Sequence, residues 1–402
     1  MSDLRERFDY SAVLESVTTP GLDELRARAG KRRTRRAVGV SATLSLAAVA
    51  VLAAVTLPTL LPISPATPPA DGGRAWPVPP GEIRLTHVEF VDARHGFAYY
   101  ESRPTTGSCE GALRATDDGG ESWSDLRGMP CVPPGERIRR VSTLAVDADT
   151  LLQANQPGTQ GHLSHDGGRT WRAYGLRTRV AEAFPPTVTP HGACASPPCT
   201  KLHRLGWYDR ETGDLMLLAN GPELVTMSAP VRATDGSVWV TGTTSDGRYV
   251  VAVTRDNGRS WTTPPLGLTG KAGDVARVAT YDGTVGYLVI IGRASDNGAI
   301  LRTGDGGKSW SRVSTIEPRF GLYGAYVATG GELLISGDDT GDLRWHISHD
   351  DGASFARAEM PQLDRVTMVA GRYTATTAFG PMPPYTSVDG LTWSEVKPPT
   401  DR

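Results

Sequence analysis

The sequence has almost no net charge and very little lysine. Its 42 basic and 44 acidic residues leave a formal net charge of −2, and only 5 of the basic residues are Lys against 37 Arg. We attribute the arginine bias to genome composition and infer no function from it. Nucleic-acid-binding domains usually carry a clear basic surplus, so the balanced charge argues against a nucleic-acid partner.

Helical periodicity is equally scarce. After residue 62, no segment of useful length repeats its apolar residues at the spacing of a helix. Glycine and proline are frequent instead, with 46 Gly and 30 Pro among 402 residues, and both favour turns. Because 39% of the residues are hydrophobic, the chain can still fold around a core. The composition favours many short elements over long helices.

Long apolar runs are limited to one. No charged residue lies between Arg36 and Asp71, and the 21 residues 37–57 are almost uniformly apolar. At about 1.5 Å per residue, a helix of that length spans about 30 Å, the thickness of a hydrocarbon core. Pro58 ends the run. The sequence therefore predicts a transmembrane helix at 37–61, in contact with membrane lipid.

Flanking charges predict the orientation of this helix. Five of the six residues 31–36 are Lys or Arg, which places 1–36 in the cytoplasm as a basic segment and the rest of the chain outside the cell. A cleaved signal peptide is the alternative, disfavoured by the long charged lead-in and the length of the run. Residues 62–81 are rich in proline and predict a semi-rigid linker.

An eight-residue pattern, Ser/Thr-x-Asp-x-Gly-x-Ser/Thr-Trp/Phe, recurs in the remainder of the chain. Five copies are close and a sixth is degenerate, because its Asp stands one place late. The six copies are TDDGGESW (116–123), SHDGGRTW (164–171), TRDNGRSW (254–261), TGDGGKSW (303–310), SHDDGASF (348–355) and TSVDGLTW (386–393).

The spacing of these copies predicts the number of repeats. The final aromatic residues, at positions 123, 171, 261, 310, 355 and 393, are 48, 90, 49, 45 and 38 residues apart. The gap of 90 is two periods, so we expect a degenerate unit near residue 215, with a hairpin at Trp207–Leu218. Seven units of about 46 residues each match the size of a propeller blade of four short strands.

Segments between the copies are typical of strands. They are short, rich in β-branched and aromatic residues, and bounded by Gly, Asp or Asn. Four examples are SVWVTGTT (237–244), RYVVAVTR (248–255), GYLVIIGR (286–293) and ELLISGDD (332–339). We therefore expect an all-β, seven-bladed β-propeller over 82–402, with a closing strand at 82–85.

The eight-residue pattern resembles the Asp-box, or BNR repeat, of the sialidase-like superfamily. The resemblance implies that the box lies on the hairpin between the third and fourth strands of a blade, away from the central ligand pocket. Its Asp, Gly and aromatic residues would then be structural and not catalytic. These residues are Asp118, Gly120, Trp123, Asp166, Gly168, Trp171, Asp256, Gly258, Trp261, Asp305, Gly307, Trp310, Asp350, Gly352, Phe355 and Trp393.

Four cysteines fit an oxidising environment outside the membrane. They are Cys109, Cys131, Cys194 and Cys199, and none has metal-ligand spacing with His. Of the three possible pairings we favour 109–131 and 194–199. The first pair is symmetric about residue 120, at the tip of a predicted hairpin, and the second flanks a short loop.

Two enzyme classes carry Asp-boxes and need comparison with this sequence. Sialidases have an Arg-Ile-Pro motif and six blades, whereas the nearest strings here are Glu82–Leu85 and Arg137–Arg140. Xyloglucanase-like glycosidases need two carboxylates that face one cleft. Acids near predicted strand ends are Asp92, Asp147, Asp209, Asp282 and Asp364, and the sequence does not show which of them converge.

Histidines near the boxes suggest catalytic or zinc sites that we reject. Ser-His-Asp occurs around His165 and His349, but three adjacent residues cannot aim at one reacting atom as a triad does. Each histidine also forms an HxxH pair, with His162 or His346, and a spacing of three along a strand puts the two on opposite faces. We predict no metal and no cofactor.

The segment 88–98, VEFVDARHGFA, is similar to the blade opening of the photosystem II assembly-factor family, whose seven-bladed propellers bind a partner protein without catalysis. We therefore expect a membrane-anchored extracytoplasmic propeller that binds a protein or a glycan. A glycoside hydrolase and a single-pass transmembrane sensor are the alternatives. The longest irregular stretch, Leu176–His203, is the expected contact surface.

Overall fold

The computed structural model describes residues 73–102, 111–130, 140–156, 160–194, 203–270, 274–291, 298–316, 321–338, 343–377 and 384–400. All regular elements in these ranges are strands. The predicted cytoplasmic segment 1–36 and transmembrane helix 37–61 lie outside the described residues. Among the residues that are described, no helix is long and apolar enough to span a bilayer.

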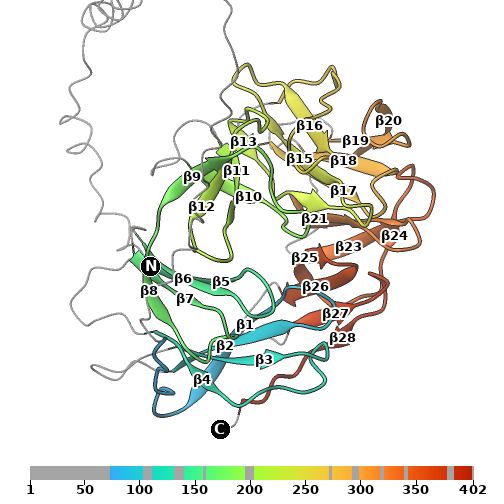
Figure 1. Ribbon diagram of the computed structural model, residues 1–402. Coiled ribbons are helices and arrows are strands. Elements are labelled where there is room, and N and C mark those ends of the chain that lie inside the picture. Colours follow the sequence, from blue (N-terminus) through green and yellow to red (C-terminus); the bar gives the residue numbers. More distant parts are fainter. Residues whose placement is uncertain are drawn as a thin grey trace, which may run out of the picture. The chain divides into compact units, whose positions relative to one another are not determined.

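Seven four-stranded sheets follow one another around a ring, as Figure 1 shows. We number them as blades 1 to 7 along the chain. Blades 1 and 2 contain β1 (Ile83–Phe90), β2 (Gly96–Ser102), β3 (Gly111–Thr116), β4 (Arg127–Gly128), β5 (Arg140–Ala145), β6 (Leu151–Gln156), β7 (Gln160–Ser164) and β8 (Arg172–Gly175). Blades 3 and 4 contain β9 (Thr178–Ala181), β10 (His191–Cys194), β11 (His203–Tyr208), β12 (Leu215–Leu218), β13 (Thr226–Met227), β14 (Val231–Arg232), β15 (Val238–Thr243) and β16 (Tyr249–Thr254).

Blades 5 to 7 repeat the simple order of blade 1, with four consecutive antiparallel strands in each. They contain β17 (Val275–Thr280), β18 (Gly286–Ile291), β19 (Gly298–Thr303), β20 (Ser311–Ile316), β21 (Gly321–Val327), β22 (Leu333–Asp338), β23 (Leu343–Ser348), β24 (Ala356–Arg357), β25 (Leu363–Val369), β26 (Arg372–Thr377), β27 (Tyr385–Ser387) and β28 (Ser394–Glu395). The prediction of a seven-bladed all-β propeller is confirmed.

The four strands predicted from sequence are present as β15, β16, β18 and β22. Their composition follows from where they lie. All six residues of β18, GYLVII, are buried, because the middle strands of a blade are covered on both faces by neighbouring blades. Such strands are continuously apolar and do not alternate.

Blade 3 departs from the common order. Its sheet runs β10-β11-β12-β9, and β9 pairs in parallel with β12, although it precedes the other three strands in the chain. The expected hairpin at Trp207–Leu218 is confirmed as β11 and β12. No hairpin joins β12 to the edge strand β9, so blade 3 has no place for an eight-residue box. The stretch Leu176–His203, expected to be irregular, instead contains β9 and β10.

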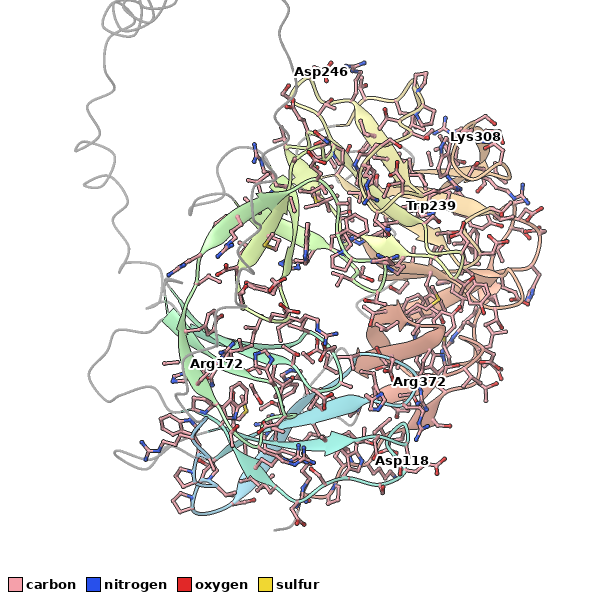
Figure 2. The ribbon with its side chains drawn as sticks, in the orientation of Figure 1. Asp118, Arg172, Trp239, Asp246, Lys308 and Arg372 are labelled. Carbon is pink, nitrogen blue, oxygen red and sulfur yellow. The ribbon has the colours of Figure 1, made fainter. Side chains whose placement is uncertain are left out.

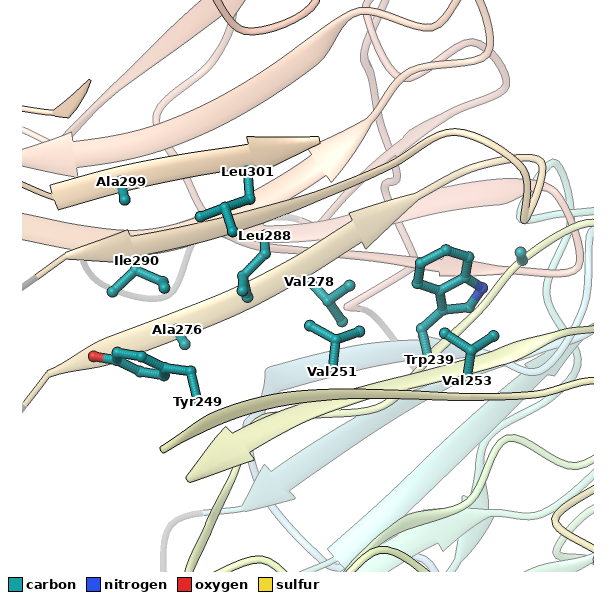
Figure 3. Close-up of a cluster of buried hydrophobic side chains, with 11 residues drawn as sticks. Trp239, Tyr249, Val251, Val253, Ala276, Val278, Leu288, Ile290, Ala299 and Leu301 are labelled. Carbon is teal, nitrogen blue, oxygen red and sulfur yellow. The ribbon is translucent and has the colours of Figure 1, made fainter. Parts of the chain in front are cut away.

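Apolar side chains from adjacent blades form the core. Figure 3 shows one such cluster between blades 4 and 5, where Trp239 and Val251 pack against Val278 and Leu288. Trp239 and Leu288 are fully buried, and burial of each such side chain contributes about 1.5–3 kcal/mol. Equivalent clusters lie at the other junctions, so each blade is stabilised by its two neighbours.

Blade 7 meets blade 1 through side-chain contacts. The Tyr100 hydroxyl of β2 donates to the Pro399 carbonyl at 2.8 Å, and Val396 packs in the core of blade 1. Arg372 of β26, labelled in Figure 2, donates to the Ala93 carbonyl and lies over the Phe90 ring. Residues 83–90 form the first strand of blade 1 and do not join the sheet of blade 7. The expected closing strand at 82–85 is therefore wrong.

A short segment before β1 crosses the edges of two blades. Arg74 exchanges two backbone hydrogen bonds of 2.9 and 3.0 Å with Trp171, next to blade 2. Trp76 forms a bridge with Gly128 of blade 1 and contacts the His162 ring at 5.7 Å. We call residues 73–79 the strap. It lies within the segment 62–81 that the sequence predicts as a linker.

Candidate functional site

Each eight-residue box folds into a turn held by its Asp. In blade 1 the Thr116 hydroxyl donates to Asp118 Oδ1 at 2.8 Å, and the Ser122 amide donates to the same oxygen at 2.9 Å. The Ser122 hydroxyl donates to Oδ2 at 2.5 Å. The Gly120 amide then donates to the Thr116 hydroxyl at 2.9 Å. One carboxylate therefore fixes both ends of the turn.

The same bonds recur in blades 2, 4, 5 and 6. The first hydroxyl donates to the Asp over 2.7–2.9 Å, and the amide of the seventh residue donates over 2.8–2.9 Å. Hydrogen bonds from serine hydroxyls lower the pKa of Asp256 and Asp350 to about 2 and hold that of Asp118 and Asp305 far below its usual range. These carboxylates stay ionised, and their oxygens accept hydrogen bonds within their own turns.

In the degenerate sixth copy the Asp stands one position later and still accepts hydrogen bonds from its turn. Asp389 accepts the Leu391 and Thr392 amides at 2.8 and 2.7 Å, and the Ser387 hydroxyl at 2.8 Å. Gly390 takes a positive φ of 81°, as the fifth-position glycines of the other box turns also do. A carboxylate one place later in the chain thus closes the same kind of hairpin.

Box aromatics lie at the base of these turns. Trp171 is 2% exposed and belongs to the core between blades 1 and 2. Trp310 packs edge-on against Trp239 at 6.2 Å, and Phe355 packs against the core of blades 5 and 6. In Figure 2 two residues of box turns, Asp118 and Lys308, lie at the periphery of the ring, and Trp239 lies inside it.

A second set of acids closes other hairpins, three of them between the first two strands of a blade and one between β11 and β12 of blade 3. Asp92 Oδ1 accepts the Arg94 and His95 amides, both at 2.7 Å. Asp147, Asp209 and Asp282 each accept two backbone amides in the same way, over 2.7–3.1 Å. Four of the five acids considered for glycosidase chemistry therefore act as turn residues, and the Asp364 side chain lies outside the described part of the structure.

Residues of the histidine patterns make local contacts. Ser348 Oγ donates to Asp350 Oδ1 at 2.9 Å and accepts the Gly352 amide, so it bonds within its turn. His165 Nε2 lies 3.0 Å from the Arg172 guanidinium. Within the described part of the chain, no group of three His, Cys, Asp or Glu is placed to hold a metal. The side chains of all four cysteines lie outside the described residues, so the disulfides stay a prediction.

A hollow of about 330 Å³ lies between blades 5 and 6, lined by three turns. The hairpin between β17 and β18 contributes Tyr281 and Asp282, and the hairpin between β21 and β22 contributes Glu332. His349 and Asp351 enter from the box of blade 6. The hollow therefore combines an aromatic ring, an imidazole and three carboxylates, which suits a polar ligand.

Arg302 of β19 adds a cation to this hollow. Its Nε lies 3.1 Å from Asp351 Oδ1, and the Tyr287 hydroxyl donates to the same oxygen at 3.1 Å. Hydrogen bonding to Tyr287 raises the pKa of Arg302, and burial raises that of Tyr287. Asp351 has a φ of 60°, at the box position where the turns of blades 1, 2 and 5 have glycine.

Sequence reasoning did not identify this hollow. Its residues come from three turns that are 16 or more positions apart, and only the ring brings them together. One signal was present, because box position four is glycine in the copies of blades 1, 2 and 5 and Asp351 in the copy of blade 6. A charged residue at a position that needs positive φ is uncommon and indicates a local role.

No protein-family model matches the sequence, and no curated protein matches it. Solved structures resemble the fold. A puromycin-hydrolyzing peptidase of Mycobacterium tuberculosis matches with 12% identity, 81% of this chain and 56% of that chain covered, and a TM-score of 0.46. YCF48 from Cyanidioschyzon merolae matches with 14% identity, 78% and 94% coverage, and a TM-score of 0.39.

The GH74 xyloglucanase from Xanthomonas campestris matches with 16% identity, 74% and 43% coverage, and a TM-score of 0.32. The chain thus spans about half the length of the peptidase and less than half of the xyloglucanase. These likenesses concern the fold alone. The seven sheets themselves define the class of this protein, a seven-bladed β-propeller.

Proposed function

We propose that this protein is a membrane-anchored extracytoplasmic propeller that binds a protein or glycan partner in the hollow between blades 5 and 6, without catalysis. The observation that carries the proposal is the hollow itself, where Tyr281, Glu332, His349 and Asp351 meet from three turns. Propellers present ligand-binding loops on a rigid ring, and two of these turns are held by the hydrogen bonds of their own Asp282 and Asp350.

Acids elsewhere in the molecule support a binding role over hydrolysis. Glycoside hydrolysis needs a pair of free carboxylates that face one substrate. The box acids and the hairpin acids, of which Asp118 and Asp92 are examples, accept backbone amides in their own turns. We infer that the boxes are Asp-boxes with a structural role, as their resemblance implies.

Anchoring is part of the same proposal and comes from the sequence alone. The apolar run 37–57 and the five cations within 31–36 support a helix with its N-terminus in the cytoplasm. The propeller would then face the cell exterior, where envelope proteins and glycans are the available partners. Protease protection of 1–36 in intact cells tests this orientation.

The binding proposal is tested with the full chain and a panel of envelope oligosaccharides and candidate envelope proteins. We expect Glu332→Gln and His349→Ala each to weaken binding about tenfold, the usual loss for one buried polar contact. His165→Ala is the matched control, because His165 occupies the same box position in blade 2. Equal losses in H165A and H349A would contradict the proposal.

Turnover gives a further readout for the same hollow. Hydrolysis of an aryl glycoside that is abolished by Glu332→Gln would replace the binding role with that of a glycoside hydrolase. Three carboxylates line the hollow, so this measurement distinguishes the two functions directly. We expect no hydrolysis by the wild-type chain.

A further inference from the structure

A second hollow lies where blade 6 connects to blade 7. Its volume is about 360 Å³, and it shares no lining residue with the hollow between blades 5 and 6. Arg344 and Trp345 of β23, Arg357 of β24 and the connection 358–362 form its wall. The inference that follows does not depend on the proposed function, because it concerns different residues.

The two arginines share one face of the sheet. His346 pairs directly with Arg357, so their side chains lie on the same face, and Arg344 is two residues before His346 on that face. Arg344 and Arg357 are therefore diagonal neighbours across the strand pair, within reach of long side chains. Like charges at this spacing repel each other, and an anion between them would remove that repulsion.

The balance of charge in the hollow also favours an anion. Within the part of the chain that the structure describes, the exposed Arg357 guanidinium makes no ion pair or hydrogen bond. Glu359 is the single acid among the described lining residues, against two arginines. The hollow therefore has a net positive charge and at least one guanidinium available for a ligand.

The remaining wall indicates the size and character of the ligand. Met360 and Pro361 provide apolar surface, and the Gln362 amide provides both a donor and an acceptor. A volume of about 360 Å³ is at the lower end of small-molecule sites. Guanidinium groups match carboxylate and phosphate oxygens by paired N–H donors. We propose that this hollow binds a small ligand that carries a carboxylate or phosphate group.

Binding to the full chain is measured by calorimetry with three probes of similar size. Methyl glucuronide carries a carboxylate, glycerol 3-phosphate carries a phosphate, and methyl glucoside is neutral. We expect at least one anion to bind and the neutral sugar not to bind. The stronger of the two anions identifies which group the hollow selects.

Variants connect that binding to the arginines. We expect Arg357→Gln to weaken anion binding about tenfold, Arg357→Lys to have a smaller effect because charge remains, and rising salt to weaken binding. Arg312→Gln is the matched control, since Arg312 is an exposed residue of the outer strand β20. The thermal midpoint of each variant confirms that the propeller is folded.

Three results would each overturn the assignment. One is the absence of binding by both anions at millimolar concentration to a folded chain. Another is equal affinity for the neutral and charged probes. The third is equal loss of binding in R357Q and R312Q, which would mean that the arginines act only through overall charge.

Discussion

At the scale of single residues, Ala370 stands in a backbone conformation that alanine rarely takes. Ala370 and Gly371 form the two-residue turn between β25 and β26, with φ of 48° and 81°. Turns of this geometry favour Asn-Gly. We expect Ala370→Asn to raise the free energy of unfolding by about 0.5–1 kcal/mol, measured by urea denaturation.

Gly371 provides the matched control for this turn. A Cβ at Gly371 would meet no atom within 4 Å, so any cost of Gly371→Ala comes from its positive φ. We expect G371A to lower stability by about 1 kcal/mol. An unchanged stability in both variants would show that the turn relaxes to another conformation.

Glu89 is a second residue whose environment affects a measurable property, the dependence of stability on pH. Its Oε2 accepts the Ala145 amide of blade 2 at 3.1 Å and faces the Tyr99 hydroxyl at 3.4 Å. Burial raises the pKa of Glu89 from 4.5 to about 7. Because the folded pKa is the higher one, protonation stabilises the fold fully below pH 4.5, and this contribution is lost as pH rises to about 7.

We therefore expect Glu89→Gln to remove a fall in thermal stability between about pH 5 and pH 7. Glutamine keeps an oxygen for the Ala145 amide and carries no charge at any pH. Glu121→Gln is the control, because Glu121 is exposed in the box of blade 1. A pH profile that is the same in wild type and E89Q would mean that Glu89 does not titrate in this range.

At the scale of elements, the strap 73–79 extends the folded unit beyond the boundary that the sequence indicates. Its proline content predicts a linker, but the backbone of Arg74 and Trp76 pairs with Trp171 and Gly128. We expect Trp76→Ala to lower the free energy of unfolding by about 2 kcal/mol, since this ring is partly buried. Val78→Ala, at an exposed position of the same strap, is the control.

A substitution at Gly128 of blade 1 tests the same contact from the side of the blade. A Cβ there would lie 2.2 Å from the Pro77 carbonyl oxygen, so Gly128→Ala must displace the strap or β4. We expect proteolysis near residue 76 to accelerate in G128A. Resistance equal to that of wild type would show that the strap does not depend on this close approach.

Strand register bears on the predicted disulfide in blade 1. β3 and β4 pair Ala112 with Gly128 and Leu113 with Arg127. The same register, continued by three residues, would place position 109 opposite position 131. We expect a Cys109–Cys131 peptide in non-reduced digests, identified by mass spectrometry. Recovery of Cys109 bonded to Cys194 or Cys199 would contradict the pairing.

Local pattern determined most of what the sequence could predict about elements. Strands such as β18 were predictable because burial on both faces demands a continuous apolar run. β9 and β10 were not, since prolines at 185–190 obscure two strands of only four residues each. The parallel pairing of β9 with β12 depends on tertiary contacts, and no local signal encodes it.

At the scale of the whole molecule, the number of blades followed from repeat spacing, but the two hollows did not. Arg302 and Glu332 are 30 positions apart, and only the closed ring brings their turns together. Arg344 and Arg357 meet through a strand register that the sequence does not specify. The spacing of the repeats predicts the architecture of the ring, whereas the candidate ligand sites are formed by residues that differ between repeats.

The repeated box carboxylates predict how the complete ring responds to acid. Hydrogen bonds from serine hydroxyls lower the folded pKa of Asp118 and Asp305 below the ordinary 3.8, and those of Asp256 and Asp350 to about 2. A lowered folded pKa gives stability that is present above pH 3.8 and is lost as pH falls toward 2. Since the blades depend on one another for burial, we expect cooperative unfolding over that interval.

Substitutions at two neighbouring residues distinguish the effect of the turn carboxylate on acid unfolding from the effect of general surface charge. Asp118→Asn removes the charged acceptor of the Ser122 amide and hydroxyl, whereas Asp117→Asn alters the exposed position beside it. We expect D118N to lower the thermal midpoint at pH 7 and to reduce the further fall between pH 4 and pH 2, and D117N to do neither. If the two variants behave alike, acid unfolding reflects net charge, and the box aspartates do not hold the blades in the way that their hydrogen bonds indicate.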